Sequence, residues 1–335
     1  MTQLNFFRGR GAAFLCALAI AFSAPTVNAQ EMTQLKLRMA AFAFGFNAGL
    51  FLAMERGWLK AGGVELLVED GTGSTATVNL LGSGQYDIGE AAVSAMATAR
   101  DKGMPLKAIA VFIRETDLGV LVPKGSGWKT PKDLEGRKLA YTAGSLEGPF
   151  MEAFFKAGNA NMSKVEMLNV DLPSKINLYL ASKADAVVTT VPFIVPMAAA
   201  KRPSDAIMFG DYGFVLPSIG YIATEQTIKN KSRALQTFVT AITRAWHEIL
   251  DDNKIDDGVA AMLKQRPQAK IDVAIARGQV EAYRSFFYTK NTKGKPLGWQ
   301  SPEDWAAAIA SMQKVGLIRA GAKPQDFYTN EFYPR

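Results

Sequence analysis

The residues from Lys107 to Pro123 constrain the fold most, because two apolar runs flank a short polar segment there. Both runs are rich in β-branched and aromatic side chains, which strands favour. Continuous apolar runs of this length are typical of strands that helices bury on both faces. The polar break, Arg114-Glu-Thr-Asp117, therefore predicts that the chain leaves one sheet here and enters another.

The same order of strand, loop and helix recurs on both sides of this crossing. We expect strands at 35–39, 64–68, 87–89, 137–141, 165–170 and 184–189, and helices at 50–61, 75–81, 91–102, 151–155 and 174–182. Such alternation implies parallel sheets with right-handed crossovers. A second extended stretch at 212–223 is suited to a return crossing. We therefore predict an α/β fold with two βα lobes, joined by two crossing segments, and a ligand cleft between them.

Chain length and composition agree with two lobes. A chain of 335 residues exceeds the size at which one core keeps growing. Hydrophobic residues make up 48% and charged residues 21%, as in ordinary globular proteins. The formal charge of +7 comes from scattered lysines and arginines, so we expect a solvated basic surface and no nucleic-acid partner. The predicted boundaries are 30–113 and 218–335 for the first lobe with the C-terminal helices, and 114–217 for the second.

The first 29 residues have the pattern of a secretory signal. Arg8 and Arg10 precede an apolar run over 12–22, and small residues lead to a cleavage site after Ala29. The run is too short to span a bilayer. Cleavage removes two arginines and no acid, which takes the charge from +7 to +5. It also removes Cys16, the only cysteine, so the mature chain would have no disulfide and no thiolate ligand.

In open α/β sheets, ligands bind beyond the carboxyl ends of the strands, where loops lead into helix N-termini. The first such loop carries Phe42, Phe44, Phe46 and Asn47. Alternate phenylalanines share one face of an extended segment. They therefore either belong to the core or line the cleft and stack on a flat ligand.

The second loop, Gly71-Thr-Gly-Ser-Thr75, is rich in glycine and hydroxyl groups ahead of a helix. Ser74 and Thr75 are candidates for ligand contacts or for a plain helix N-cap. The loop has neither of the glycine-rich nucleotide fingerprints. Glu90 follows a strand end and can either accept a hydrogen bond from ligand or favour the helix start.

Arg114 lies at the crossing itself. Its guanidinium can clamp a carboxylate or sulfonate, or it can pair with Glu115 or Asp117, which we favour. The candidates in the second lobe lie at strand ends or beside buried strands, namely Tyr141, Ser145, Asp185, Thr189 and Thr190. His247, the only histidine, is off the apolar stripe of its helix and should face solvent. These loops offer no pair of nucleophile and base, so we predict a non-enzymatic site without cofactor or metal.

Several segments in a fixed order are similar to those of one family: Gly49-Leu-Phe-Leu-Ala-Met-Glu-Arg-Gly-Trp58, Gly84-Gln-Tyr-Asp-Ile-Gly89, Ala184-Asp-Ala-Val-Val188, Pro302-Glu-Asp-Trp305 and Phe327-Tyr-Thr-Asn330. Together with the export signal, they resemble the solute-binding proteins of ABC importers for nitrate, sulfonates, taurine and thiamine-pyrimidine precursors. The resemblance covers nearly the whole mature chain. It implies a type II periplasmic-binding-protein fold and a periplasmic, monomeric protein. Such a protein would deliver its solute to a membrane permease with an ATPase, docking there peripherally.

The resemblance does not identify the ligand. Three phenylalanines beside Asn47 lead us to expect an aromatic or heteroaromatic solute, with an aliphatic sulfonate as the alternative. The rival from another class is a pyrimidine synthase, because a branch of the same superfamily makes the thiamine pyrimidine with histidine and iron. A single histidine predicted to be exposed, no mature cysteine and the export signal argue against that rival.

Overall fold

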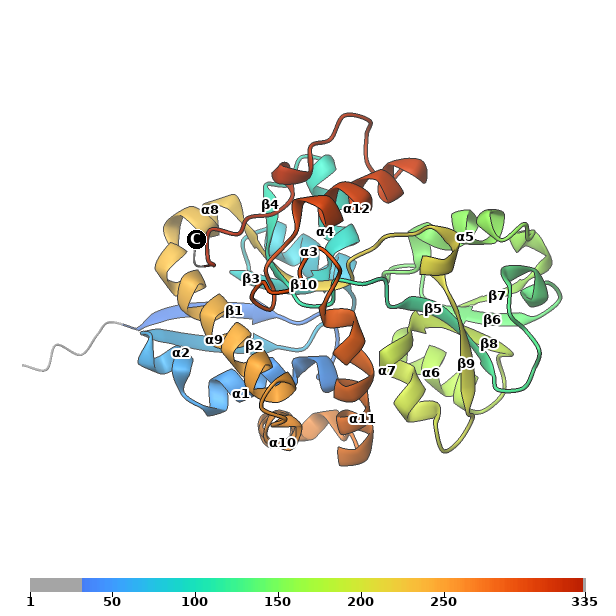
Figure 1. The fold of residues 1–335 in the computed structure, drawn as a ribbon, viewed down its shortest axis with the longest axis horizontal. Helices are drawn as coiled ribbons and strands as arrows, with labels where there is room; N and C mark the ends of the chain where they lie inside the picture. The colour runs from blue at the N-terminus through green and yellow to red at the C-terminus, as the bar shows by residue number, and fades with distance from the viewer. Residues whose placement is uncertain (1–31, 334–335) are drawn as a thin grey trace, which may run out of the picture. The chain divides into compact units, whose positions relative to one another are not determined.

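The computed structural model describes residues 32–333. Its ten strands form two five-stranded sheets, which Figure 1 shows on opposite sides of the molecule. The first sheet has the order β2-β1-β3-β10-β4 and the second β7-β6-β8-β5-β9. The strands are β1 (Thr33–Arg38), β2 (Val64–Glu69), β3 (Ile88–Ala92), β4 (Leu106–Val111), β5 (Leu118–Pro123), β6 (Lys138–Tyr141), β7 (Glu166–Asn169), β8 (Ala186–Thr190), β9 (Ser204–Met208) and β10 (Ile219–Thr224).

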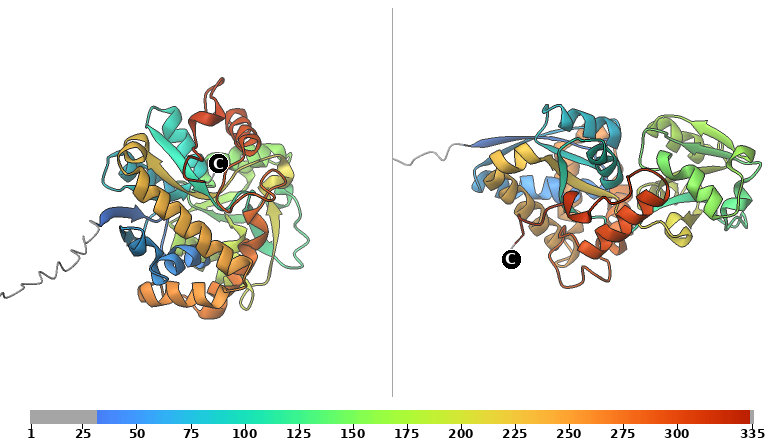
Figure 2. Two further views of the ribbon diagram at one scale, coloured as in Figure 1. Left: turned by 60° about the vertical axis from the view of Figure 1, so that its left-hand side comes forward. Right: turned by 90° about the horizontal axis from the view of Figure 1, so that it is seen from above.

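The chain passes between the sheets twice. It leaves the first sheet after β4 and enters the second at β5, as the polar break at 114–117 predicts, and it returns between β9 and β10. Figure 2 shows the two groups of strands in two further views. Residues from Met32 onward group as one compact unit, so the lobe boundaries named above stay a prediction.

The expectation of purely parallel sheets is wrong for one strand in each sheet. β10 is antiparallel to both β3 and β4, and β5 is antiparallel to both β8 and β9. These two strands are the ones that the crossings feed, so they enter their sheets without a βαβ connection. β9 was not expected at all from the sequence.

Helices cover both sheets. They are α1 (Ala48–Glu55), α2 (Trp58–Ala61), α3 (Ser74–Gly82), α4 (Val93–Asp101), α5 (Met151–Ala157), α6 (Leu172–Leu180), α7 (Val191–Ala198), α8 (Glu225–Asn230), α9 (Ser232–Leu250), α10 (Ile255–Gln265), α11 (Val273–Tyr283) and α12 (Pro302–Lys314). The single helix expected at 50–61 is two helices, because Gly57 adopts a φ of 71° between α1 and α2.

The C-terminal part packs onto this frame. The apolar stripe of α9, including Leu235, Ile242 and Trp246, is buried in the core. Phe327 and Phe332 in the tail are also buried, as expected from its aromatic sequence. α11 packs against α7 and so links the first-sheet region to the second. Within residues 32–333, no helix is both long and apolar enough to cross a membrane.

Candidate functional site

The main cavity lies between the two sheets and has a volume of about 440 Å³. Most of its lining comes from residues at or after the carboxyl ends of six strands, β1, β2, β3, β6, β7 and β8, where ligands bind in open α/β sheets. The volume is in the range of small-molecule sites. It is lined by Ala40, Ala41, Phe42, Phe44, Gly71, Thr72, Gly73, Ser74, Ala92, Thr142, Gly144, Ser145, Leu146, Glu147, Asp171, Leu172, Pro173, Lys175, Thr189, Thr190, Phe193 and Ile219.

Three aromatic rings form one wall of this cavity. The ring centroids of Phe44 and Phe193 are 4.9 Å apart at an interplanar angle of 65°, and those of Phe42 and Phe193 are 6.1 Å apart. Phe42 is half-buried, whereas Phe44 and Phe193 are buried. The edges and faces of these rings offer a flat ligand an apolar contact surface.

Phe46 does not line the cavity with the other two phenylalanines. The segment is not extended, because a 3-10 turn at Gly45–Asn47 begins directly after Phe44. Phe46 is therefore turned into the core, fully buried, where its ring centroid lies 6.0 Å from that of Trp246. Phe42 and Phe44 therefore line the cavity, and Phe46 belongs to the core.

Asn47 and Glu90 support the aromatic loop from behind. Asn47 accepts a hydrogen bond from the backbone N–H of Phe44 at 3.0 Å and donates to Glu90 Oε2 at 2.6 Å. Both residues are fully buried and neither lines the cavity. Burial raises the pKa of Glu90 to about 7, and the Asn47 hydrogen bond offsets part of that rise.

Hydroxyl groups from both sheets face the cavity. Ser74 Oγ accepts a hydrogen bond from the backbone N–H of Ala92 at 3.0 Å, so its own hydrogen stays available to a ligand. Thr189 and Thr190 end β8, and Tyr283 donates to Thr190 Oγ1 at 3.4 Å. Ser145 enters from the second-sheet side.

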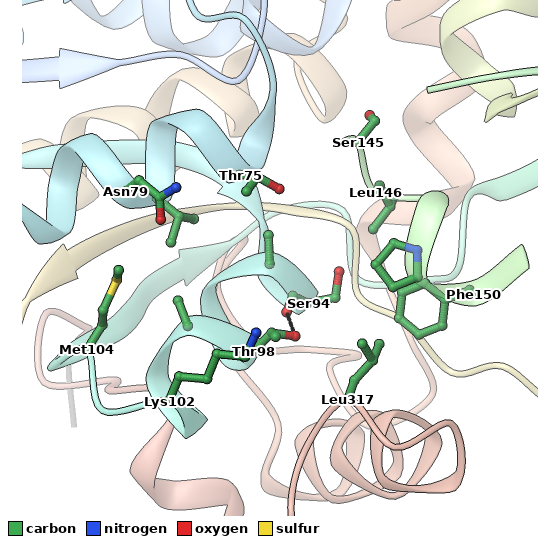
Figure 3. A pocket seen from close by; sticks show the side chains of 14 residues that line it. Thr75, Asn79, Ser94, Thr98, Lys102, Met104, Ser145, Leu146, Phe150 and Leu317 are labelled. Carbon is green, nitrogen blue, oxygen red and sulfur yellow. Dashed lines mark hydrogen bonds between the residues drawn. The ribbon is translucent and has the colours of Figure 1, made fainter. Parts of the chain in front are cut away.

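A smaller cavity of about 220 Å³ lies beside the main one and shares Ser145 and Leu146 with it. Figure 3 shows α3 and α4 on one side of this space, with Leu146 and Phe150 on the other. Thr75 lines this smaller cavity and not the main one. Its Oγ1 donates to the carbonyl of Gly144 at 3.1 Å. This hydrogen bond joins α3, beside the first sheet, to the loop after β6 of the second sheet.

Arg114 braces the crossing. It donates to the carbonyls of Val111 at 3.2 Å and Pro296 at 2.7 Å. Among the described residues it forms no ion pair with Glu115 or with Asp117, whose two carboxylate oxygens have no hydrogen-bond partner. The favoured pairing is therefore wrong, because the guanidinium is occupied by the backbone carbonyl of nearby Val111 and by that of Pro296 in a distant segment. Burial lowers the pKa of Arg114 to about 10.

Tyr141 and Asp185 also lie outside the cavity lining. Tyr141 ends β6, half-buried against the second-sheet core. Asp185 precedes the first residue of β8 and accepts a hydrogen bond from the N–H of Lys138 at 2.8 Å. It is therefore at the opposite end of β8 from Thr189 and Thr190, where a ligand between the sheets would not reach it.

Three further residues of the site were not expected from the sequence. Glu147 and Lys175 form a buried ion pair in the cavity wall, and Phe193 completes the aromatic wall. A signal for Lys175 exists in the sequence, because Leu172, Lys175, Ile176 and Tyr179 follow helical spacing. A lysine on such a face is either paired or functional.

Gln279 of α11 connects the two sides behind the aromatic wall. Its Oε1 accepts from the N–H of Gly45 and its Nε2 donates to the carbonyl of Phe193, both at 2.8 Å. It thus fixes the loop that carries Phe44 against the start of α7. Gly45 is required at this contact, because a Cβ there would lie 2.5 Å from the Cβ of Gln279.

His247 lies on α9 and bonds Asp251 at 2.6 Å through Nδ1, with 42% of its side chain exposed. It faces solvent, as expected, and is not part of the cavity lining. Within residues 32–333, no three His, Cys, Asp or Glu side chains gather in a way that could hold a metal ion.

Residues 47–254, more than half of the chain, match the family model described as NMT1/THI5 like. A 4-amino-5-hydroxymethyl-2-methylpyrimidine phosphate synthase of Schizosaccharomyces pombe is 28% identical over 96 residues, 29% of this chain and 28% of the relative. The match therefore spans less than a third of that synthase.

Two other relatives match over most of the chain. The formylaminopyrimidine-binding protein of Halalkalibacterium halodurans is 19% identical over 284 residues, 84% of this chain and 85% of the relative. A synthase of the same description from Aspergillus parasiticus is 22% identical over 306 residues, 86% of this chain and 83% of the relative.

Solved structures share the fold. The alkanesulfonate-binding protein SsuA from Xanthomonas axonopodis pv. citri, bound to MOPS, matches with a TM-score of 0.67 at 15% identity over 89% of this chain and 99% of that one. The periplasmic nitrate-binding protein NrtA from Synechocystis PCC 6803 matches with a TM-score of 0.65 at 13% identity over 91% of this chain and 88% of that one. The chain belongs to the NMT1/THI5-like family and has the type II periplasmic-binding-protein fold.

Proposed function

We propose that this protein is the solute-binding component of an ABC-type importer. One observation carries the proposal: the main cavity is formed jointly by strand-end loops of two sheets, between which the described chain passes twice. A solute bound there touches both regions at once, so its binding favours the closed arrangement. Family membership and the formylaminopyrimidine-binding relative support this assignment.

The remaining parts of the proposal follow from this role. The chain is exported to the periplasm, with its signal cleaved after Ala29, although residues 1–31 lie outside the described part. Its partners are a membrane permease, at which it docks peripherally, and the ATPase of that permease. It acts as a monomer and needs no cofactor.

The aromatic wall favours an aromatic or heteroaromatic solute. Phe42, Phe44 and Phe193 offer the surface on which a flat ring packs, while Ser74, Ser145, Thr189 and Thr190 supply polar contacts at its edges. The alternative is an alkylsulfonate, as in the SsuA relative of the same fold. A sulfonate would draw mainly on hydroxyl and backbone donors.

A thermal-shift screen of the mature chain from Gln30 tests the proposal. It should include aromatic carboxylates, pyrimidines, flavins, sulfonates and nitrate. A ligand that binds only the folded state raises the melting temperature with its concentration. Calorimetry should then give one site per chain. If no compound of any class shifts the melting temperature, the solute-binding role is rejected.

The second candidate function is pyrimidine synthesis, which the match to the Aspergillus parasiticus synthase over 86% of this chain favours. Against it, the only histidine lies on the outer face of α9, away from the cavity. Purified protein that binds iron stoichiometrically, or that releases a pyrimidine product, would establish the enzyme and replace the transport role.

A further inference from the structure

A buried ion pair forms part of the main cavity wall. Lys175 Nζ contacts Glu147 Oε1, and the two side chains are only 2% and 3% exposed. Lys175 is in the first turn of α6, and Glu147 is in the loop after β6. Removing two charges from water is costly, and apolar residues of similar volume often serve stability as well or better. A contribution to stability therefore does not explain why two charged residues occupy this part of the cavity wall.

The pair has unused hydrogen-bonding capacity. Glu147 Oε1 accepts from both Lys175 Nζ and the N–H of Thr142, the latter at 3.1 Å. Within residues 32–333, no hydrogen bond to Glu147 Oε2 is formed, and Glu147 Oε1 is the one partner of Lys175 Nζ. A carboxylate oxygen accepts up to two bonds and an ammonium donates three. An acceptor and donors therefore stand side by side at the cavity.

The charge balance of the cavity disfavours an anionic ligand. Among the described residues that line the cavity, Lys175 is the only one with a cationic side chain, and Glu147 already compensates it. The remaining charged residue, Asp171, is acidic and exposed, and it caps α6 by accepting from the N–H of Ser174. The lining thus carries one positive and two negative formal charges. A buried sulfonate or carboxylate would need an uncompensated cation or several further donors.

We propose that Glu147 and Lys175 recognise a ligand edge on which an N–H donor stands next to an acceptor, as in an amino group beside a ring nitrogen. Glu147 Oε2 accepts a hydrogen bond from the N–H of the ligand, and Lys175 Nζ donates one to the neighbouring acceptor atom. The solute is thus a neutral or cationic amino-substituted heterocycle and not a sulfonate. This inference rests on the proposed solute-binding function and specifies its substrate class.

Three probes of similar size test the inference by calorimetry. They are 4-aminopyrimidine, which has the donor beside the acceptor, pyrimidine, which has acceptors only, and benzenesulfonate, which is anionic. Wild-type protein should bind 4-aminopyrimidine at least tenfold more tightly than either of the others. Glu147→Gln replaces an accepting oxygen with a donating amide, so it should reduce that preference at least tenfold while pyrimidine affinity changes less than threefold.

A matched control is Glu166→Gln, an exposed glutamate at the start of β7 in the same region, which should leave all three affinities unchanged. Glu147→Gln leaves the buried Lys175 ammonium without a counter-charge, which can prevent folding. In that case the double variant Glu147→Gln/Lys175→Met removes both charges together. That variant should fold, keep pyrimidine binding and lose the preference for the amino group.

Tighter binding of benzenesulfonate than of 4-aminopyrimidine overturns the inference, as does a preference that survives both Glu147 variants. If benzenesulfonate binds and Phe42→Ala weakens it, the solute-binding function stands and only this inference fails. If none of the three probes and no compound of the wider screen binds, both are rejected.

Discussion

At the scale of single residues, the aromatic loop shows how near neighbours take different roles. Phe42 and Phe44 line the cavity, whereas Phe46 packs on Trp246 in the core. Asn47 and Glu90 then hold the loop from its buried side. Truncation at these positions should therefore separate binding from stability.

Phe42→Ala and Phe46→Ala form a matched pair for this purpose. Loss of the half-buried Phe42 ring should weaken binding of an aromatic ligand by about 1–3 kcal/mol, by analogy with base stacking on aromatic side chains. Loss of the Phe46 ring leaves a core cavity and should reduce the free energy of unfolding by about 3–5 kcal/mol. Calorimetry and urea unfolding measure the two effects. Unchanged affinity of the Phe42→Ala variant for an aromatic ligand would contradict the stacking role of Phe42.

Glu90 should make stability depend on pH. Burial raises its pKa to about 7 in the folded protein, above about 4.3 in an unfolded chain. The folded state therefore holds a proton that the unfolded state releases between these values, so stability is greatest at the acidic end and falls as pH rises through 7. Glu90→Gln should reduce the loss between pH 5 and 8 by on the order of 2–3 kcal/mol.

Urea unfolding at a series of pH values measures that slope. Asp117, whose pKa burial also raises to about 7, contributes in the same direction, so the slope should shrink in Glu90→Gln and not vanish. The exposed Glu152→Gln is the control and should keep the wild-type slope. Equal slopes in wild type and Glu90→Gln would mean that Glu90 is ionised in the folded state.

At the scale of elements, α11 joins parts of the chain that are far apart in sequence. Gln279 bonds Gly45 in the aromatic loop and Phe193 at the start of α7, and Gly278 of the same helix lies against Pro196. The cavity wall is thus held from behind by one helix of the C-terminal half.

Gln279→Ala should show how much this brace contributes. The substitution leaves a buried N–H and a buried carbonyl without partners, at a cost of about 1–3 kcal/mol for each group. The free energy of unfolding should fall by that order, and ligand affinity should fall with it because Phe44 and Phe193 lose their common support. Gln226→Ala on the exposed face of α8 is the control. A stability loss no larger than in this control would contradict the bracing role.

At the scale of the whole molecule, the two crossings run side by side between the sheets. Ser218 donates through its N–H to the carbonyl of Ile113 at 2.9 Å, and Thr116 Oγ1 donates to the carbonyl of Phe214 at 3.0 Å. Two hydrogen-bonded segments make a narrow joint, about which hinge motion can take place. Arg114 ties this joint to Pro296 of the C-terminal part.

Ligand binding should therefore close the molecule. X-ray scattering at saturating ligand should give a smaller radius of gyration than scattering of the free protein. At a ligand concentration of 100 times Kd, the folded state should gain about 2.7 kcal/mol, which thermal unfolding measures. A rise in melting temperature without any compaction would support ligand binding and contradict hinge closure.

The sequence by itself determined much of the order of elements. The positions of the strands other than β9, the crossing at 114–117, the buried stripe of α9 and the aromatic tail all follow from local apolar patterns. These patterns are readable because strand and helix periodicities are set within a few residues. Strand-end positions also pointed to Phe42, Phe44, Ser74, Ser145, Thr189 and Thr190, which the structure brings together at the cavity.

Only the tertiary structure decided the remaining features. The antiparallel entry of β5 and β10 depends on pairing between distant strands. Phe46 turns into the core while Phe44 lines the cavity, because a 3-10 turn over Gly45–Asn47 begins directly after Phe44. The Glu147–Lys175 pair joins residues 28 positions apart, and the bond from Gly45 to Gln279 spans 234 positions. Local sequence can mark Lys175 as a lysine on a buried helix face, but it identifies the partner in neither contact, because only the folding of remote segments brings the partners together.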